Sequence, residues 1–429
     1  MPRPLRHLCC ANQSISQDRS CPNEAMLTCS GCFLVRYCSK ECQTAHWRSH
    51  KRDCKNPMNS KSWSPTWVKE NRKPVFLVGG TGTGLQTKQR FGKGMGLWGD
   101  MTSIDIINVE NNEATGDLCN VIRTINGLPE NYSGTIEIVL NDINPIAVCR
   151  NLIILSILGV IEDEEVAEHA LHIWYSVFLP FSYQTRIVPH LARAPTLQSF
   201  DGTPAHLTSS TMTYVRWSLD SIRFLYMQLS RKDVDSAVAR DALNSTMNAP
   251  ERVDYRERQY ASLRPSHRVA FDTWRRSGLL LPFGDINDRV SIPNRWLFSP
   301  MGDILLNDGS SPLQGWDYNE VVKAGRAHGT TEDDLMGGLF FYVKDQLVEF
   351  SQRLRRFKIN IYSYDQDVRD LPSMLKRDTS SPQNFDRIEV SNIVDKNYVG
   401  ISLLSDWGRL LSKNNPHAAV VGHFMNWTT

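Results

Sequence analysis

Cysteine and histidine side chains near the start of this 429-residue chain have the spacing of zinc ligands. Eight of the ten cysteines lie within the first 54 residues. The candidate ligands are Cys10, Cys21, Cys29, Cys32, Cys38, Cys42, His50 and Cys54. Zn²⁺ prefers thiolate and imidazole, and four such ligands close a tetrahedral structural site. The sequence therefore predicts two zinc ions, which must supply most of the folding free energy of so short a segment.

The segment from Cys29 to Cys54 resembles the MYND zinc finger. The shared features are an initial Cys-x2-Cys, a Cys-x3-Cys-Gln run at 38–43, Trp47 and a final His-x3-Cys. Because the two sites of that family interleave, the resemblance implies two ligand sets. They are Cys10, Cys21, Cys38 and Cys42, and then Cys29, Cys32, His50 and Cys54. Independently of the resemblance, the last two of these are one helical turn apart and can bind one ion from one helix face. Loss of a site is expected to unfold the finger and to spare the rest of the chain.

Two positions beside these sets leave alternatives. Ten residues follow Cys10 before the next cysteine, where relatives have only a few, so Cys9 or His7 could take its place. The Cys-Ala-Asn context of Cys10 favours that residue. His46 lies one turn before His50, but His50 completes the family spacing. His46 is therefore expected outside the ligand set.

The finger is also expected to bind other proteins. MYND fingers resemble docking modules that accept short proline-containing peptides, and the resemblance places Gln43 and Trp47 in the peptide groove. The alternative is that Trp47 only packs the small core. Residues 1–56 contain nine Lys or Arg against four Asp or Glu. Zinc–thiolate sites carrying about −2 and −1 offset most of that excess, so the charge gives little support for nucleic acid as a partner.

Composition places the chain among intracellular proteins. The first residues, MPRPLRHL, lack the apolar region of a secretory signal, so the cysteines are expected to bind metal in a reducing compartment. The longest apolar run, 152–161, is about half as long as a membrane span. These features predict a soluble cytoplasmic or nuclear protein without a membrane partner.

Changes in composition along the chain predict three regions. Residues 1–56 form the finger, 57–73 a polar linker, and 74–429 an α/β domain with a mainly helical insertion at about 200–350. The glycine-rich run at 79–84 follows an apolar segment, as a phosphate-binding loop would. It lacks the Gly-Lys-Ser/Thr ending and does not complete G-x-G-x-x-G, so it is expected to be a loop.

The large domain has the pattern of a Rossmann-like, mostly parallel sheet. Strands are predicted at 135–141, 358–364, 385–390 and 418–424, with helices at 144–158 and 163–179 after the first strand. Apolar strands separated by helices or long connections are typical of a parallel, doubly wound sheet. The four strands, which end near Asp142, Asp370, Val390 and Phe424, are therefore expected to be neighbours in one sheet.

Several runs of this domain resemble class I S-adenosylmethionine (SAM) methyltransferases. They are VLNDINPIAVCRN (139–151), DVRDLP (367–372), FDRIEVSNIVD (385–395) and LLSKNNPHAAVV (410–421). The resemblance implies that Asp142 holds the ribose, Asp367 faces the adenine and Gly116 belongs to the turn beside the amino-acid part. The whole chain also resembles fungal MYND-finger proteins whose large domain is shared with the methyltransferase-like dynein axonemal assembly factors. The matching stretches include 97–109, 116–129, 172–180 and 385–393.

One departure weakens a claim to the cofactor. Gly116 is a single glycine, and only six residues, 110–115, separate it from the apolar run 104–109. Either that run serves as the first strand or the strand is lost, so weak or no SAM binding is expected. No catalytic pair stands out, and Asn392 is expected to be a buried structural residue. The sequence thus favours an interaction protein with a methyltransferase-like platform over an active SAM-dependent methyltransferase.

Overall fold

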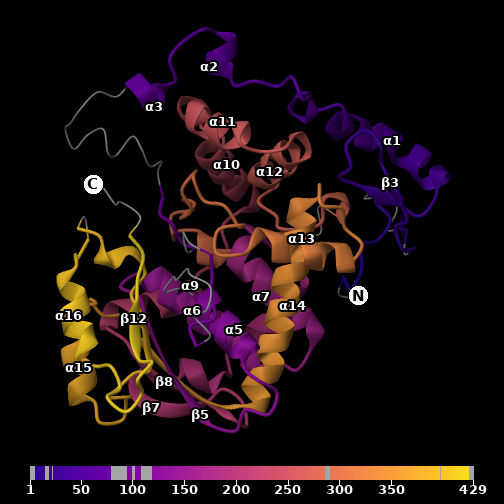
Figure 1. Ribbon diagram of the computed structural model, residues 1–429. Helices are drawn as coiled ribbons and strands as arrows, with labels where there is room; N and C mark the ends of the chain where they lie inside the picture. The colour runs from indigo at the N-terminus through magenta and orange to yellow at the C-terminus, as the bar shows by residue number, and fades with distance from the viewer. Residues whose placement is uncertain are drawn as a thin grey trace.

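A computed structural model describes residues 5–14, 19–21, 23–78, 94–98, 102–107, 118–285, 290–396 and 398–424. It shows the finger at one corner of a large α/β body, with the linker crossing the top of the body (Figure 1). The glycine-rich run at 79–84, the segment 110–115 and Gly116 lie outside the described residues.

The finger consists of short strand pairs and one helix. Strands β1 (Gln13–Ser14) and β2 (Arg19–Ser20) form one antiparallel pair, and β3 (Leu27–Thr28) and β4 (Arg36–Tyr37) form another. Helix α1 spans Lys40–Cys54. Its N-cap is Ser39, whose hydroxyl accepts a hydrogen bond from the Cys42 amide at 3.3 Å. This cap begins the helix within one turn of the strand pair.

The lower part of the body in Figure 1 contains a four-stranded sheet with the order β5-β10-β8-β7. Strands β5 (Thr135–Asn141) and β10 (Lys358–Tyr364) run parallel over their full length, which confirms the predicted pairing of these two segments. On its other edge β10 pairs in parallel with β8 (Thr211–Arg216), and β8 pairs antiparallel with β7 (Asp201–His206). The sheet is therefore mixed, with two parallel pairings and one antiparallel pairing.

The prediction of one sheet for all four segments is wrong. Strands β11 (Arg387–Glu389) and β12 (Ala419–Val421) pair in parallel with each other, in a separate two-stranded sheet. They cannot extend β10, because β5 and β8 occupy both of its edges. The region 200–350, predicted as a mainly helical insertion, begins with the β7–β8 hairpin. This region therefore supplies two strands of the four-stranded sheet as well as helices. The run TMTYVR of β8 alternates buried and half-buried residues, which is the pattern of such a strand.

Most of the helices lie above this sheet in the view of Figure 1. The longer ones are α5 (Leu118–Gly127), α6 (Pro145–Val160), α7 (Glu164–Tyr175), α9 (Leu219–Ser230), α10 (Ser236–Met247), α11 (Val253–Ala261), α12 (Pro265–Ser277), α13 (Tyr318–Ala327) and α14 (Leu335–Arg356). The short ones are α2 (Thr66–Lys69), α3 (Val75–Val78), α8 (Val188–Leu191), α15 (Leu371–Arg377) and α16 (Ser402–Gly408). Strands β6 (Phe178–Pro180) and β9 (Val290–Pro293) form a further antiparallel pair.

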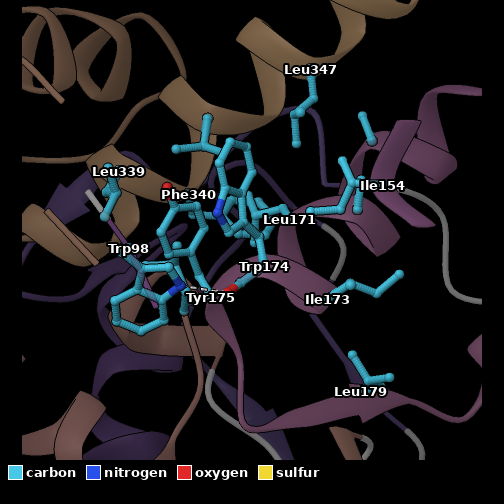
Figure 2. Packing of buried hydrophobic residues seen from close by; sticks show 14 of the residues in the cluster. Trp98, Ile154, Leu171, Ile173, Trp174, Tyr175, Leu179, Leu339, Phe340 and Leu347 are labelled. Atoms are coloured by element: carbon cyan, nitrogen blue, oxygen red, sulfur yellow. Dashed lines mark hydrogen bonds between the residues drawn. The ribbon is translucent and has the colours of Figure 1, made fainter. Parts of the chain in front are cut away.

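The core of the body is aromatic where α7 meets α14. Trp174, Tyr175 and Phe340 are fully buried and lie close to Trp98 (Figure 2). The Trp98 indole N–H donates to the Trp174 carbonyl at 2.8 Å, which satisfies the polar atom of a buried ring. None of the helices in the described ranges has both the length and the apolar character that crossing a bilayer demands.

The finger and the body share one hydrophobic core. Leu8, Val35 and the ligand Cys32 belong to the same buried cluster as the aromatic side chains of α7 and α14. The finger rests on the segment 328–334 between α13 and α14, which we call the docking loop. The Leu8 amide donates to the His328 carbonyl at 2.9 Å, and the Thr331 hydroxyl donates to the Phe33 carbonyl at 2.6 Å. Because of these contacts, unfolding of the finger is expected to lower the stability of the body as well.

His328 connects the docking loop to the N-terminal arm of the finger. Its Nδ1 lies 2.6 Å from the Arg6 carbonyl oxygen, its Nε2 lies 2.8 Å from an Asp345 carboxylate oxygen, and its ring stacks on Phe341 at 4.6 Å. Both partner atoms accept hydrogen bonds, so the cationic imidazole, with protons on both ring nitrogens, is the form that satisfies both contacts. The hydrogen bond with Asp345 raises the pKa of His328, against burial and the nearby Lys344 ammonium.

We expect the His328 contacts to weaken as the pH rises. A pKa that is higher in the folded state adds stability below the unfolded value of about 6.5, and this stability is lost as the pH rises through the folded pKa. Between about pH 6 and 8, wild-type protein should lose about 1 kcal/mol of unfolding free energy relative to His328→Ala. Urea unfolding of both proteins across this range measures the difference. A constant difference would contradict the cationic imidazole.

Candidate functional site

The first group of candidate ligands contains Cys10, Cys21, Cys38 and Cys42. Their Sγ atoms all lie within 4.8 Å of one another, with 3.6 Å between Cys21 and Cys38 and 3.5 Å between Cys38 and Cys42. Cys38 directly follows β4 and Cys42 lies in the first turn of α1, so the Ser39 cap sets their separation. The backbone amide of Cys10 donates to the Asn23 carbonyl at 3.0 Å. This hydrogen bond holds the first ligand beside the segment that follows Cys21.

The second group contains Cys29, Cys32, His50 and Cys54. The Sγ atoms of Cys29 and Cys54 are 3.8 Å apart, and His50 Nε2 lies 3.4 Å from the sulfurs of Cys29 and Cys32. His50 and Cys54 come from one face of α1, as their spacing predicts. Helix α1 therefore contributes to both groups, its first turn to one and its last turn to the other.

Both groups fit a tetrahedral zinc ion. Bond lengths of about 2.3 Å to sulfur and about 2.0 Å to nitrogen place two sulfurs about 3.8 Å apart and a sulfur about 3.5 Å from a nitrogen. The five separations given above, 3.4 to 3.8 Å, agree with these values to within a few tenths of an ångström. Gly31 makes room for the second group, because a Cβ at that position would lie 2.8 Å from Cys54 Sγ. Gly31 was not among the predicted site residues, although its position between the ligands Cys29 and Cys32 is a signal for close packing.

The structure also distinguishes the neighbouring candidates. Cys9 Sγ lies 3.7 Å from the His7 carbonyl and is not in either group, whereas Cys10 is. His46 lies outside the groups too. Its Nδ1 is 3.1 Å from the Tyr37 hydroxyl, and its ring stacks on His50 at 6.0 Å. His46 therefore supports the orientation of a ligand without being one.

Protonation of these side chains opposes metal binding at low pH. Burial raises the pKa of Cys10 to about 12 and raises that of Cys32 further, so these thiols hold their protons until a metal displaces them. The hydrogen bond between Cys38 and Cys42 lowers the pKa of Cys38 to about 7. Burial lowers the pKa of His50 to about 4, so its imidazole is neutral at pH 7 and can bind metal. Zinc binding must release thiol protons and weakens in acid.

The predicted peptide-binding residues lie next to each other on α1. Gln43 and Trp47 are one helical turn apart, so their side chains share a face. Gln43 is half-buried, and 39% of Trp47 is exposed. The Trp47 ring meets His50 edge-on at 6.1 Å. Trp47 thus packs against a candidate zinc ligand with one part of its ring and exposes the rest to solvent.

A cleft of about 1140 Å³ runs along the whole of edge strand β5 as far as the turns that follow β5 and β10, and it is also lined by residues 382–393. Asp142 and Asp367 both line it, as predicted, and Gly116 lies outside the described residues. Both carboxylates already accept hydrogen bonds: Asp142 from the Asn144 amide at 2.8 Å, and Asp367 from the Arg369 amide at 2.9 Å and its Nε at 2.8 Å. The Arg369 guanidinium lowers the pKa of Asp367 to about 2, so this carboxylate is ionised and paired.

Asn392 departs from its predicted role. It is half-buried and lines the cleft, so it is not the fully buried structural residue that was expected. The short helical turn of residues 391–394, which begins at Ser391 in the left-handed conformation with φ of 49°, sets its position. The sequence did not predict this turn, because a left-handed residue is usually signalled by glycine and position 391 is serine.

Comparison with known families agrees with this geometry. Residues 10–54 match the MYND finger family, a range that begins at Cys10 and ends at Cys54. Residues 97–179 match a family described as Domain of unknown function (DUF4470), which covers β5, α6 and α7. No solved structure matches the chain.

Proposed function

We propose that this chain, whose residues 10–54 form a MYND finger with a Cys₄ and a Cys₃His zinc site, is a protein-interaction protein. Its finger binds a proline-containing peptide segment of a partner through Gln43 and Trp47, and its body acts as a platform that fixes the direction of the finger. The single observation that carries the proposal is the half-exposed Trp47 beside Gln43, on the helix that supplies ligands to both zinc groups.

The chemistry of these two side chains suits such a peptide. A tryptophan provides a large rigid apolar surface, and a proline-rich segment is extended before it binds, so little conformational entropy is lost. The Gln43 amide offers both a donor and an acceptor to the peptide backbone. Trp47 cannot move freely, because His50 is buried under its ring. The surface is thus preorganised by the zinc site below it.

The linker supports the role of the body as a platform. The Arg268 guanidinium donates to the Met58 and Ser60 carbonyls, both at 3.2 Å, and lies 4.8 Å from the centre of the Trp63 ring. Further along, Arg72 makes two hydrogen bonds of 2.6 and 2.7 Å with the buried carboxylate of Asp254. The docking loop contacts Leu8 and Phe33 of the finger. The Arg268 and Asp254 contacts anchor the linker that follows the finger. The finger is therefore fastened on two sides.

A SAM-dependent methyltransferase ranks second. The approach of Asp142 and Asp367 to one cleft supports it, since open α/β sheets hold ligands at the carboxyl ends of their strands. The pairing of Asp367 with Arg369 weakens it, because the Arg369 amide and guanidinium already occupy most of the acceptor positions of this carboxylate. We therefore assign the cleft no catalytic role in this proposal.

We expect Trp47→Ala to weaken peptide binding by about 30- to 100-fold, the effect of removing a central aromatic anchor worth about 2–3 kcal/mol. The measurement is fluorescence anisotropy of labelled proline-containing peptides, chosen from an array, with the zinc-loaded full chain. Tyr226→Ala is a matched control, because it removes an exposed aromatic side chain from α9 in the body. Unchanged affinity in Trp47→Ala, or no bound peptide in the array, would refute the proposal.

A further inference from the structure

One face of helix α1 carries a row of cations. Lys40, Arg48, Lys51 and Lys55 are all exposed, and their spacing of 8, 3 and 4 residues keeps them within one side of the helix. Trp47 lies at the edge of the same side, between Lys40 and Lys51 along the axis. We call Lys40, Arg48 and Lys51 the basic row. From the sequence, these positive charges were interpreted only as offsetting the negative charge of the zinc–thiolate sites.

The basic row has no ion-pair partner within the described parts of the chain, although the charge of Lys40 acts on the neighbouring Glu41 carboxylate. Lys40, Arg48 and Lys51 form no ion pair with any residue of those ranges, whereas the neighbouring Arg52 pairs with Asp53 at 3.5 Å. The helix dipole does not account for the whole row. A cation is favourable in the last turn of a helix, where Lys51 lies, but unfavourable at the first residue, where Lys40 lies. An external anion explains both positions.

We propose that the peptide bound by the finger carries acidic residues on both sides of its proline segment and runs along α1, with Trp47 on the proline and the basic row on the acids. This inference rests on the proposed function and specifies its partner. Lys40 and Lys51 are separated by eleven residues, or roughly 16 Å along the helix axis. An extended peptide covers this distance in about five residues. The two acidic residues therefore stand about five positions apart.

The test compares two labelled peptides with the same proline core and either Glu or Gln at the flanking positions. Binding to the zinc-loaded full chain is followed by fluorescence anisotropy at 50 and 300 mM NaCl. The Glu peptide should bind about 10-fold more tightly at low salt, and the advantage should shrink at high salt because the charges are exposed and screened. The double variant Lys40→Glu/Lys51→Glu should abolish the preference.

A matched control variant and three alternative outcomes distinguish the possible results of this test. Lys323→Glu/Lys376→Glu makes the same change in net charge on α13 and α15 of the body and should leave the preference intact. Equal affinity for the Glu and Gln peptides would overturn the inference and leave the proposed function standing. Failure of both peptides to bind would instead remove the proposed function. Tighter binding of a 20-base-pair DNA duplex than of the Glu peptide would assign the basic row to nucleic acid and overturn the inference.

Discussion

Replacing Cys32 by serine should release zinc, unfold the finger and lower the stability of the body. Cys32 is fully buried, and its sulfur lies 3.4 Å from His50 Nε2 in the second ligand group. Structural zinc supplies about 10–16 kcal/mol in isolated finger peptides, more than the small finger core can replace. Because Leu8 and Val35 belong to the core of the body, unfolding the finger exposes the surface under them. Elemental analysis should give fewer than two zinc ions per chain, and thermal unfolding by circular dichroism should shift down by several degrees.

Cys9→Ser is the control for this experiment. Cys9 is adjacent to the ligand Cys10, but its sulfur lies beside the His7 carbonyl, outside both groups. The variant should retain two zinc ions and the wild-type melting curve. Loss of zinc from Cys9→Ser, or two ions retained in Cys32→Ser, contradicts the ligand assignment. A body that melts at the wild-type temperature in Cys32→Ser contradicts the shared core while leaving the zinc sites in place.

Gly325→Leu should destabilise the protein by about 3 kcal/mol and weaken the contacts between the finger and the docking loop. Helices α13 and α14 approach so closely that a Cβ on Gly325 would lie 2.6 Å from the Gly338 Cα and 2.5 Å from the Thr330 hydroxyl. Backbone cannot yield at that distance, so a side chain at 325 must push the helices apart. The docking loop between them then moves away from Phe33 and Leu8. Urea unfolding measures the stability, and limited proteolysis near the linker measures the loosening.

Gly408 provides the matched position for this prediction. It lies in helix α16, and a Cβ there would meet no atom within 4 Å. Gly408→Ala should be neutral or stabilising by up to about 1 kcal/mol, because alanine favours a helix over glycine. Gly325→Ala should destabilise despite that same preference. Both variants should keep two zinc ions, since no ligand changes. Equal stability changes at the two positions would show that the close approach of α13 and α14 is unimportant.

Much of the fold followed from local patterns. The strands at Thr135–Asn141 and Lys358–Tyr364 have the predicted bounds, and their parallel pairing was expected because long connections separate them. The edges of the sheet were not predictable in this way. The choice of β8 over β11 as the second neighbour of β10 depends on which segment packs better against a strand more than 140 residues away in sequence. No local periodicity carries that information.

The zinc chemistry of the finger could be predicted from the spacing of its ligands. Cys-x2-Cys, the Cys38–Cys42 pair and the His50–Cys54 pair each bring two ligands together through one turn or one helical step, so short-range geometry selects them. The placement of the finger on the body depends instead on contacts between segments that are distant in sequence. The Arg36 guanidinium reaches the Gly329 carbonyl across 293 residues of sequence, and the docking loop has no motif of its own. The direction of the finger, its shared core with the body and the cleft beside Asp142 arise from packing between distant segments, because the free energy of such contacts depends on shape and burial that no spacing of residues encodes.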